Sequence, residues 1–91
     1  MPKRSRLSTI YDILEALSTN GGEMRATRLA TYTNMAYDRL ASLLEDLEKK
    51  GLVRVESEGR VKVVIITRKG LEALNRLRDM KRLLEDLGLG F

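Results

Sequence analysis

The chain has 91 residues, which is room for one domain and too little for two. Hydrophobic residues make up 43% of it and charged residues of both signs 33%, a balance typical of a chain that folds. It contains no cysteine and no histidine, which excludes disulfides, cysteine or histidine zinc sites, and thiolate or imidazole catalysis. We therefore expect no enzyme, no cofactor, no metal site and no small-molecule substrate.

The distribution of charge is more informative than the net value of +4. Residues 1–35 carry a net charge of +2, residues 36–51 of −1, residues 52–70 of +3 and residues 71–91 of zero. A basic excess near the N-terminus and in the middle of the chain favours a partner that carries phosphates. The longest apolar run, Val63 to Ile66, is too short to span a bilayer, and no signal-peptide core follows Met1. We expect a cytoplasmic protein.

Three amphipathic segments open the chain. Apolar residues recur at spacings of three and four, first between Leu7 and Leu17 and later between Leu40 and Leu47. Glycines, which readily adopt positive φ, follow the first and the third segment. The expected helices cover residues 7–19, about 25–32 and about 36–50, with a turn at Thr33 and Asn34.

Two β-rich runs follow, residues 52–57 and 60–67, around a turn at Glu58 and Gly59. Their composition and spacing predict a hairpin. We expect its apolar side chains to divide between two faces, one with Val53, Val55, Val61, Val63 and Ile65 and the other with Val64 and Ile66. The second run then carries more apolar surface than a half-buried strand requires.

The last helix is expected to begin after an N-cap at Thr67 and to end at Gly88. Leu71 and Leu74 can close the core of the domain. An apolar seam continues beyond them at heptad spacing, made of Leu77, Met80, Leu84 and Leu87. The seam predicts a homodimer through the last helix; the alternative is that this helix folds back along its own domain.

Two heptads are short for a coiled coil, so we expect the dimer to bury more apolar surface. The candidates are Val64 or Ile66 of the hairpin, and Leu89 and Phe91 of the tail. The chain then has three parts: a basic N-terminal arm over residues 1–6, a domain over 7–70, and a dimerisation helix with its tail over 71–91.

Three stretches carry a family resemblance: IYDILEAL at 10–17, TNMAYDRLASLLEDLEKKGLV at 33–53 and ITRKGLEAL at 66–74. They resemble archaeal winged helix-turn-helix proteins, both predicted transcriptional regulators and chromatin-type proteins that dimerise through a C-terminal antiparallel coiled coil. The resemblance implies a mainly α fold with a small β-hairpin (α+β) and an extended C-terminal helix. It also implies that the chain binds double-stranded DNA, with the third helix in the major groove and the hairpin on the flanking backbone.

The sequence departs from the family pattern at Ala36, where family members usually place a serine that caps the third helix. We expect Asn34 to take over this cap, one or two residues earlier. The outer face of the third helix is a second departure. Arg39 is the one basic residue on this face, among several acidic residues. We therefore expect weak discrimination between DNA sequences.

The resemblance assigns candidate DNA contacts to three regions. Basic residues of the arm, the second helix and the hairpin are expected to contact phosphates: Lys3, Arg4, Arg6, Arg28, Arg54, Arg60 and Lys62. Residues of the turn and the third helix are expected near the bases: Thr33, Asn34, Tyr37, Arg39 and Ser42. The alternative for the charged residues is an ordinary solvated surface, and for Tyr37 a position partly in the core.

Two other functions compete with DNA binding. A winged helix can serve as a protein-interaction module, with the apolar strand face on a partner chain. RNA binding is disfavoured because the sequence shows no exposed aromatic platform. We interpret Glu45, Asp46 and Glu48 as a solvated acidic face and not as a metal site.

Overall fold

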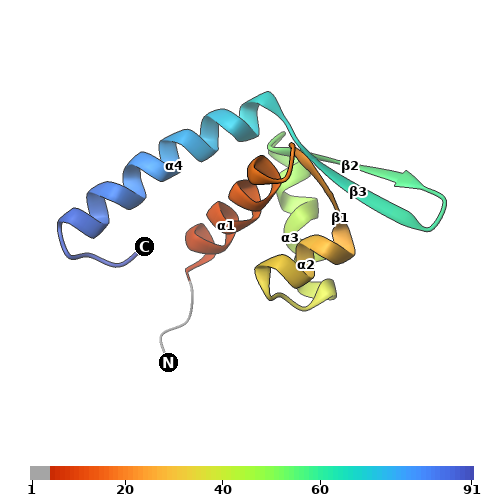
Figure 1. Ribbon diagram of the computed structural model, residues 1–91, viewed down its shortest axis with the longest axis horizontal. Coiled ribbons are helices and arrows are strands. Elements are labelled where there is room, and N and C mark those ends of the chain that lie inside the picture. The colour runs from red at the N-terminus through yellow and green to blue at the C-terminus, as the bar shows by residue number, and fades with distance from the viewer. Residues whose placement is uncertain (1–4) are drawn as a thin grey trace.

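The computed structural model describes residues 5–91, so Lys3 and Arg4 lie outside the described residues (Figure 1). Its elements follow in the order α1 (Arg6–Thr19), β1 (Glu23–Arg25), α2 (Ala26–Thr33), α3 (Tyr37–Lys49), β2 (Val53–Glu58), β3 (Val61–Ile66) and α4 (Arg68–Asp86). The expected mainly α fold with a hairpin and a long last helix is confirmed. The strand β1 was not expected, because three residues are too few to show an alternating pattern.

The three strands form an antiparallel sheet in the order β1-β3-β2, with β3 in the centre. The pairs Val53–Ile66 and Val55–Val64 lie opposite each other and share one face of the sheet. The expected division of the hairpin was therefore wrong. A two-residue turn pairs even-numbered positions of one strand with odd-numbered positions of the other, and directly opposed residues point to the same side.

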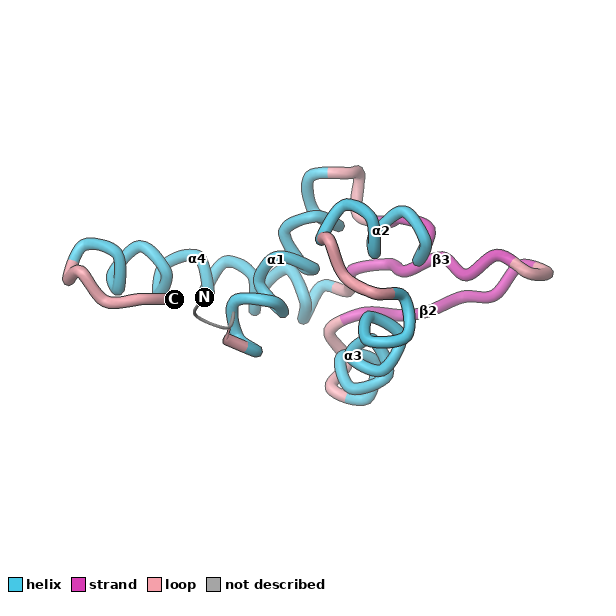
Figure 2. The backbone as a smooth tube through the Cα atoms, turned by 90° about the horizontal axis from the view of Figure 1, so that it is seen from below, coloured by secondary structure: helices cyan, strands magenta, loops and turns pink. Residues whose placement is uncertain are grey.

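The core lies between the inner face of this sheet and the helices α1, α2 and α3 (Figure 2). Its largest fully buried side chains are Ile13, Leu14, Leu17, Leu29, Leu40, Leu47, Val53, Val64 and Leu74. Leu74 closes the core from α4 as expected, whereas Leu71 is 41% exposed and does not. Val64 and Ile66 are buried within the chain, so the expectation that they add to a dimer surface was wrong.

One junction holds the start of β2 against the start of α4. The hydroxyl of Thr67 donates to the Gly51 carbonyl at 2.6 Å and accepts from the Gly70 N–H at 3.0 Å, which confirms the expected N-cap. Gly70 lies directly on the backbone of Leu52, so that a Cβ atom there would be 2.1 Å from the Leu52 carbonyl oxygen. The Gly51 and Gly70 motifs, separate in the sequence, thus form one contact.

The helix α4 runs beside α1 (Figure 1). Arg78 pairs with Glu15 of α1 at 3.8 Å, and the ammonium of Lys81 lies 4.7 Å from the centre of the Tyr11 ring. Phe91 meets the same ring edge-on at 5.5 Å. The middle of α4 and the end of the tail therefore pack on the chain's own domain, and Phe91 is already used there.

Candidate nucleic-acid interface

The helix α3 buries one face and exposes the opposite one. Leu40, Leu44 and Leu47 are buried against the domain. Four exposed residues follow one another on the far side at spacings of three and four: Asp38, Ser42, Glu45 and Lys49. This outward stripe carries two carboxylates, one hydroxyl and one ammonium, so it attracts phosphates poorly and can offer hydrogen bonds to base edges.

The turn that enters α3 differs from expectation. Asn34 adopts a left-handed conformation with φ 56° and ends α2, where its N–H donates to the carbonyls of Ala30 and Thr31. The α3 helix begins after Ala36 with no side-chain cap, so the expectation that Asn34 caps it was wrong. Thr33 is buried and its hydroxyl donates to the Leu29 carbonyl at 2.7 Å. Thr33 therefore has no exposed hydroxyl to offer to DNA.

A hollow between α1 and α3 brings two arginines together. It is lined by Arg6, Thr9, Arg39, Ser42, Leu43 and Asp46. The Arg6 guanidinium donates to Asp46 at 2.6 Å. This hydrogen bond lowers the pKa of Asp46 below its ordinary value; the charges of Arg6, Lys50 and Lys49 lower it further, and desolvation opposes them. Asp46 thus stays ionised at neutral pH, and any stabilisation from the pair is lost only in acid, as the pH falls through the lowered pKa.

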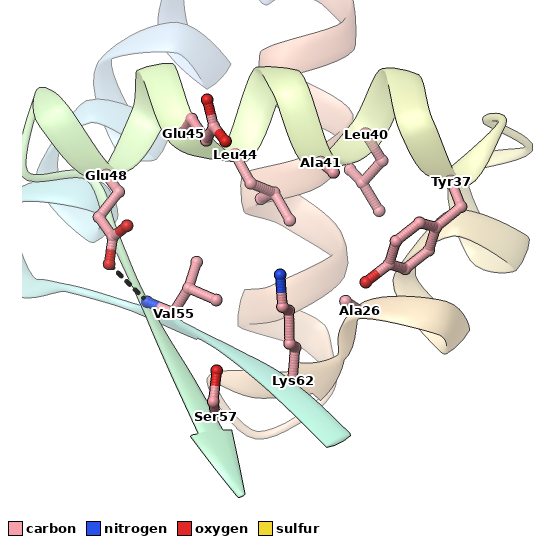
Figure 3. A pocket seen from close by; sticks show the side chains of 10 residues that line it. All are labelled: Ala26, Tyr37, Leu40, Ala41, Leu44, Glu45, Glu48, Val55, Ser57 and Lys62. Carbon is pink, nitrogen blue, oxygen red and sulfur yellow. Dashed lines mark hydrogen bonds between the residues drawn. The ribbon is translucent and has the colours of Figure 1, made fainter. Parts of the chain in front are cut away.

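A groove of about 280 Å³ separates α3 from the hairpin (Figure 3). Its floor is apolar, with Leu40, Ala41, Leu44 and Val55, and the ammonium of Lys62 points from β3 towards α3. Within the described residues no carboxylate forms an ion pair with Lys62. Lys62 therefore presents an unpaired positive charge at the mouth of this groove.

The carboxylates of Glu45 and Glu48 and the ring of Tyr37 also border the same groove. Tyr37 opens α3, is 40% exposed, and directs its hydroxyl towards the groove (Figure 3). The Glu48 carboxylate accepts a hydrogen bond from the Val55 N–H at 3.0 Å and so ties the end of α3 to β2. The groove has a fixed edge at Glu48 and an accessible aromatic ring at its other end.

The remaining basic residues expected to contact DNA lie on different parts of the surface. Arg28 is exposed on α2, and Arg60 is exposed in the turn of the hairpin, two residues from Lys62. Arg54 lies on the outer face of the sheet, away from α3, and pairs with Glu56 at 3.0 Å. The structure therefore groups Arg60 with Lys62, and Arg6 with Arg39, and separates Arg54 from both.

Two surface residues were not singled out from the sequence. Lys49 lies on the outward stripe of α3, seven residues after Ser42, and this helical spacing is the signal that identifies it. Tyr32 is exposed on α2, next to no recognisable motif. The exposed rings of Tyr32 and Tyr37 belong to different helices.

The acidic residues of α3 do not converge on a common point. Asp46 is held by Arg6 and Glu48 by the backbone of Val55. Within residues 5–91 no group of three acidic side chains is placed to hold a metal ion. Over the same residues, no helix combines the length and the apolar character needed to cross a membrane.

The order of elements and the groove between α3 and the hairpin define a winged helix-turn-helix domain. A family model described as winged helix-turn-helix matches residues 3–85. The chain belongs to this family.

One curated protein and several solved structures are similar to the chain. The chain is 31% identical over 58 residues to an uncharacterised protein of Pyrococcus abyssi, an alignment that covers 64% of this chain and 17% of that protein. Its fold is similar to Sso10a-2, a DNA-binding protein from Sulfolobus solfataricus, with TM-score 0.83 and 23% identity over 92% of this chain and 85% of that one. The resemblance to archaeal winged-helix proteins is confirmed.

Two other solved structures extend the comparison. F93 from STIV, a winged-helix DNA-binding protein, has TM-score 0.78 and 25% identity over 90% of this chain and 96% of its own. AbsC, a MarR family transcriptional regulator from Streptomyces coelicolor, has TM-score 0.74 and 31% identity over 86% of this chain and 59% of its own. The fold is thus shared with DNA-binding proteins and with transcriptional regulators.

Proposed function

We propose that the protein binds double-stranded DNA through α3 and the hairpin and acts, without enzymatic activity, as a homodimeric transcriptional regulator or chromatin-type protein in the nucleoid. The observation that carries the proposal is the unpaired ammonium of Lys62, which points into the groove between these two elements (Figure 3). A DNA backbone that follows this groove brings a phosphate to Lys62 and a second one to Arg60 at the tip. Arg6, Arg28 and Arg39, on the helices α1, α2 and α3, provide further positive charge for phosphates beyond the groove.

Recognition of bases falls to the outward stripe of α3 and to its first turn. Ser42 can donate to or accept from a base edge, Arg39 can reach a guanine from the flank of the helix, and Tyr37 offers its ring to a thymine methyl group. The carboxylates of Asp38 and Glu45 oppose deep insertion of the helix between phosphates. Affinity then rests mainly on phosphate contacts, and preference for one sequence is weak.

The combined substitution Arg60→Ala with Lys62→Ala tests this proposal. Loss of two phosphate contacts per subunit is expected to weaken binding to unrelated duplexes at least ~100-fold at ~50 mM salt, and to reduce the slope of log K against log salt by roughly 2 per subunit. Fluorescence anisotropy with several labelled duplexes at several salt concentrations measures both quantities. The loss is expected to be equal for all duplexes, because phosphate contacts carry no direct sequence information.

A matched control removes the same charge elsewhere. Arg68→Ala with Arg82→Ala changes two exposed basic residues of α4 that face away from the side of Met80, and is expected to leave affinity and slope unchanged. Equal losses in both double variants would reduce the effect to net charge and contradict an interface at the hairpin. No binding of wild-type protein at ~50 µM in ~50 mM salt would remove the DNA hypothesis and favour a protein-interaction module.

Asp46→Asn is expected to strengthen DNA binding about 3-fold at low salt. The substitution removes a negative charge beside Arg39 and releases the Arg6 guanidinium, now held at 2.6 Å, for a phosphate. The matched control is Glu72→Gln, which removes the carboxylate of the exposed Arg68–Glu72 pair on α4. Anisotropy titrations of the two variants decide the question: a gain in both, or in neither, contradicts a role for the hollow between α1 and α3.

The homodimer is proposed from the apolar surface that α4 leaves open. Met80, Leu83 and Leu87 are 45%, 57% and 62% exposed. They lie along one side of the helix, and the half-buried Leu77 and Leu84 lie between this side and the domain. Continuous apolar surface of this kind is a frequent site of association. A second α4 is the partner that supplies the same heptad pattern.

A further inference from the structure

The outer face of the sheet carries a row of aliphatic side chains. Val61, Val63 and Ile65 point away from the core, because the intervening Val64 and Ile66 are buried on the inner face. All three are half-buried, since long charged side chains from the neighbouring strands flank them. The helices α1, α2 and α3 pack against the inner face, and in the described part of the chain no helix lies over the outer face of the sheet (Figures 1 and 2).

The charges on the two sides of this row are arranged in a definite order. In one rung of the sheet, Glu23 of β1 and Arg54 of β2 flank Ile65. In the next rung on the same face, Arg25 of β1 and Glu56 of β2 flank Val63. Each rung is thus acidic on one side and basic on the other, and the order reverses from one rung to the next.

We propose that a second copy of the chain docks on this face, sheet against sheet, with a two-fold axis parallel to β3. Such an axis places each side chain of the row on its own counterpart and brings the β1 side of one copy over the β2 side of the other. Glu23 then faces Arg54 of the second copy, and Arg25 faces its Glu56. Every charge of the two rungs meets an opposite charge, so the face is complementary to itself.

The proposed contact is small. Three half-buried aliphatic side chains per copy give far less than a standard interface, so we expect a dissociation constant of about 0.1–1 mM. The inference goes beyond the proposed function and does not require DNA. If α4 also dimerises, each chain has two different self-complementary surfaces, and copies held close together on one duplex can continue into an open array.

Two single charge reversals and their mixture test the proposal. Arg25→Glu alone creates two acidic pairs across the axis, and Glu56→Arg alone creates two basic pairs. Each is expected to weaken the contact at least ~10-fold. In an equimolar mixture every reversed residue faces an opposite charge again, so association between the two variants is expected to return to within about 3-fold of the wild-type value.

The readout is the concentration dependence of backbone amide NMR shifts between about 0.05 and 1 mM, without DNA. Shifts at Val61, Val63 and Ile65 report the sheet contact, whereas shifts along α4 report the other surface, so failure of one proposal is distinguishable from failure of the other. The substituted side chains are exposed, and unchanged spectra elsewhere verify the fold. A wild-type protein without shifts in β3, variants that associate like wild type, or a mixture no stronger than its components would each overturn the proposal.

Discussion

The substitution Gly70→Ala is expected to lower the free energy of unfolding by at least ~3 kcal/mol, a large part of the stability of a small domain. The added Cβ atom would lie 2.1 Å from the Leu52 carbonyl oxygen and 2.8 Å from Cγ1 of Ile66. The first of these atoms is backbone, so relief requires α4 to move away from β2. That movement also breaks the contacts of Thr67 with Gly51 and Gly70.

Urea denaturation followed by circular dichroism measures this loss, and Gly90→Ala is its matched control. Gly90 has no atom within 4 Å of an added Cβ and no positive φ, so its substitution is expected to change stability by less than ~0.5 kcal/mol. If Gly70→Ala costs less than ~1 kcal/mol, the junction between β2 and α4 adapts easily and is not what orients the last helix.

The helices, and the junction between β2 and α4, were predictable from the sequence because their signals are local. Helical periodicity located all four helices to within about one residue, because each buries one continuous apolar face. The N-cap residue Thr67 and the two glycines that it contacts, Gly51 and Gly70, are local sequence signals, each with a definite structural role. The family resemblance rests on these residues, and they hold the hairpin to α4.

The sheet was less predictable, for two physical reasons. The three residues of β1 gain their strand conformation from pairing with Val63, Val64 and Ile65, a contact that is remote in sequence. The faces of β3 were assigned incorrectly because both are apolar, and apolarity alone does not show which one meets the helices. The length of the hairpin turn, which pairs Val53 and Val55 with even-numbered positions of β3, was the signal that could have decided this question.

The candidate site was predictable as a set of surface bases but not as an arrangement. Arg6 and Asp46 are 40 positions apart, and the fold alone brings them to 2.6 Å. Arg54 and Lys62 belong to one hairpin, yet they lie on opposite faces of the sheet. The sequence shows that the hairpin is positively charged. Only the pairing of the strands shows that Lys62 faces α3 and that Arg54 does not.

The combined substitution Met80→Glu with Leu87→Glu is expected to yield a monomer and to weaken DNA binding about 100-fold, because two linked half-sites lose their shared avidity. Both side chains are exposed in a single chain, so the change leaves the core intact. Leu77 is less suitable for this test because it packs against the core. In a dimer the four introduced carboxylates would be buried against apolar surface without partners, which is strongly unfavourable.

Sedimentation equilibrium at ~100 µM measures the oligomeric state, where a dimer with a micromolar dissociation constant is almost fully formed. The control is Leu71→Glu, which introduces a carboxylate at an exposed position on the side of α4 opposite to Met80, nine residues earlier. It is expected to remain a dimer with unchanged affinity for DNA. A wild-type chain that sediments as a monomer would contradict the α4 dimer, and the exposed leucines of α4 would then require a partner of a different kind.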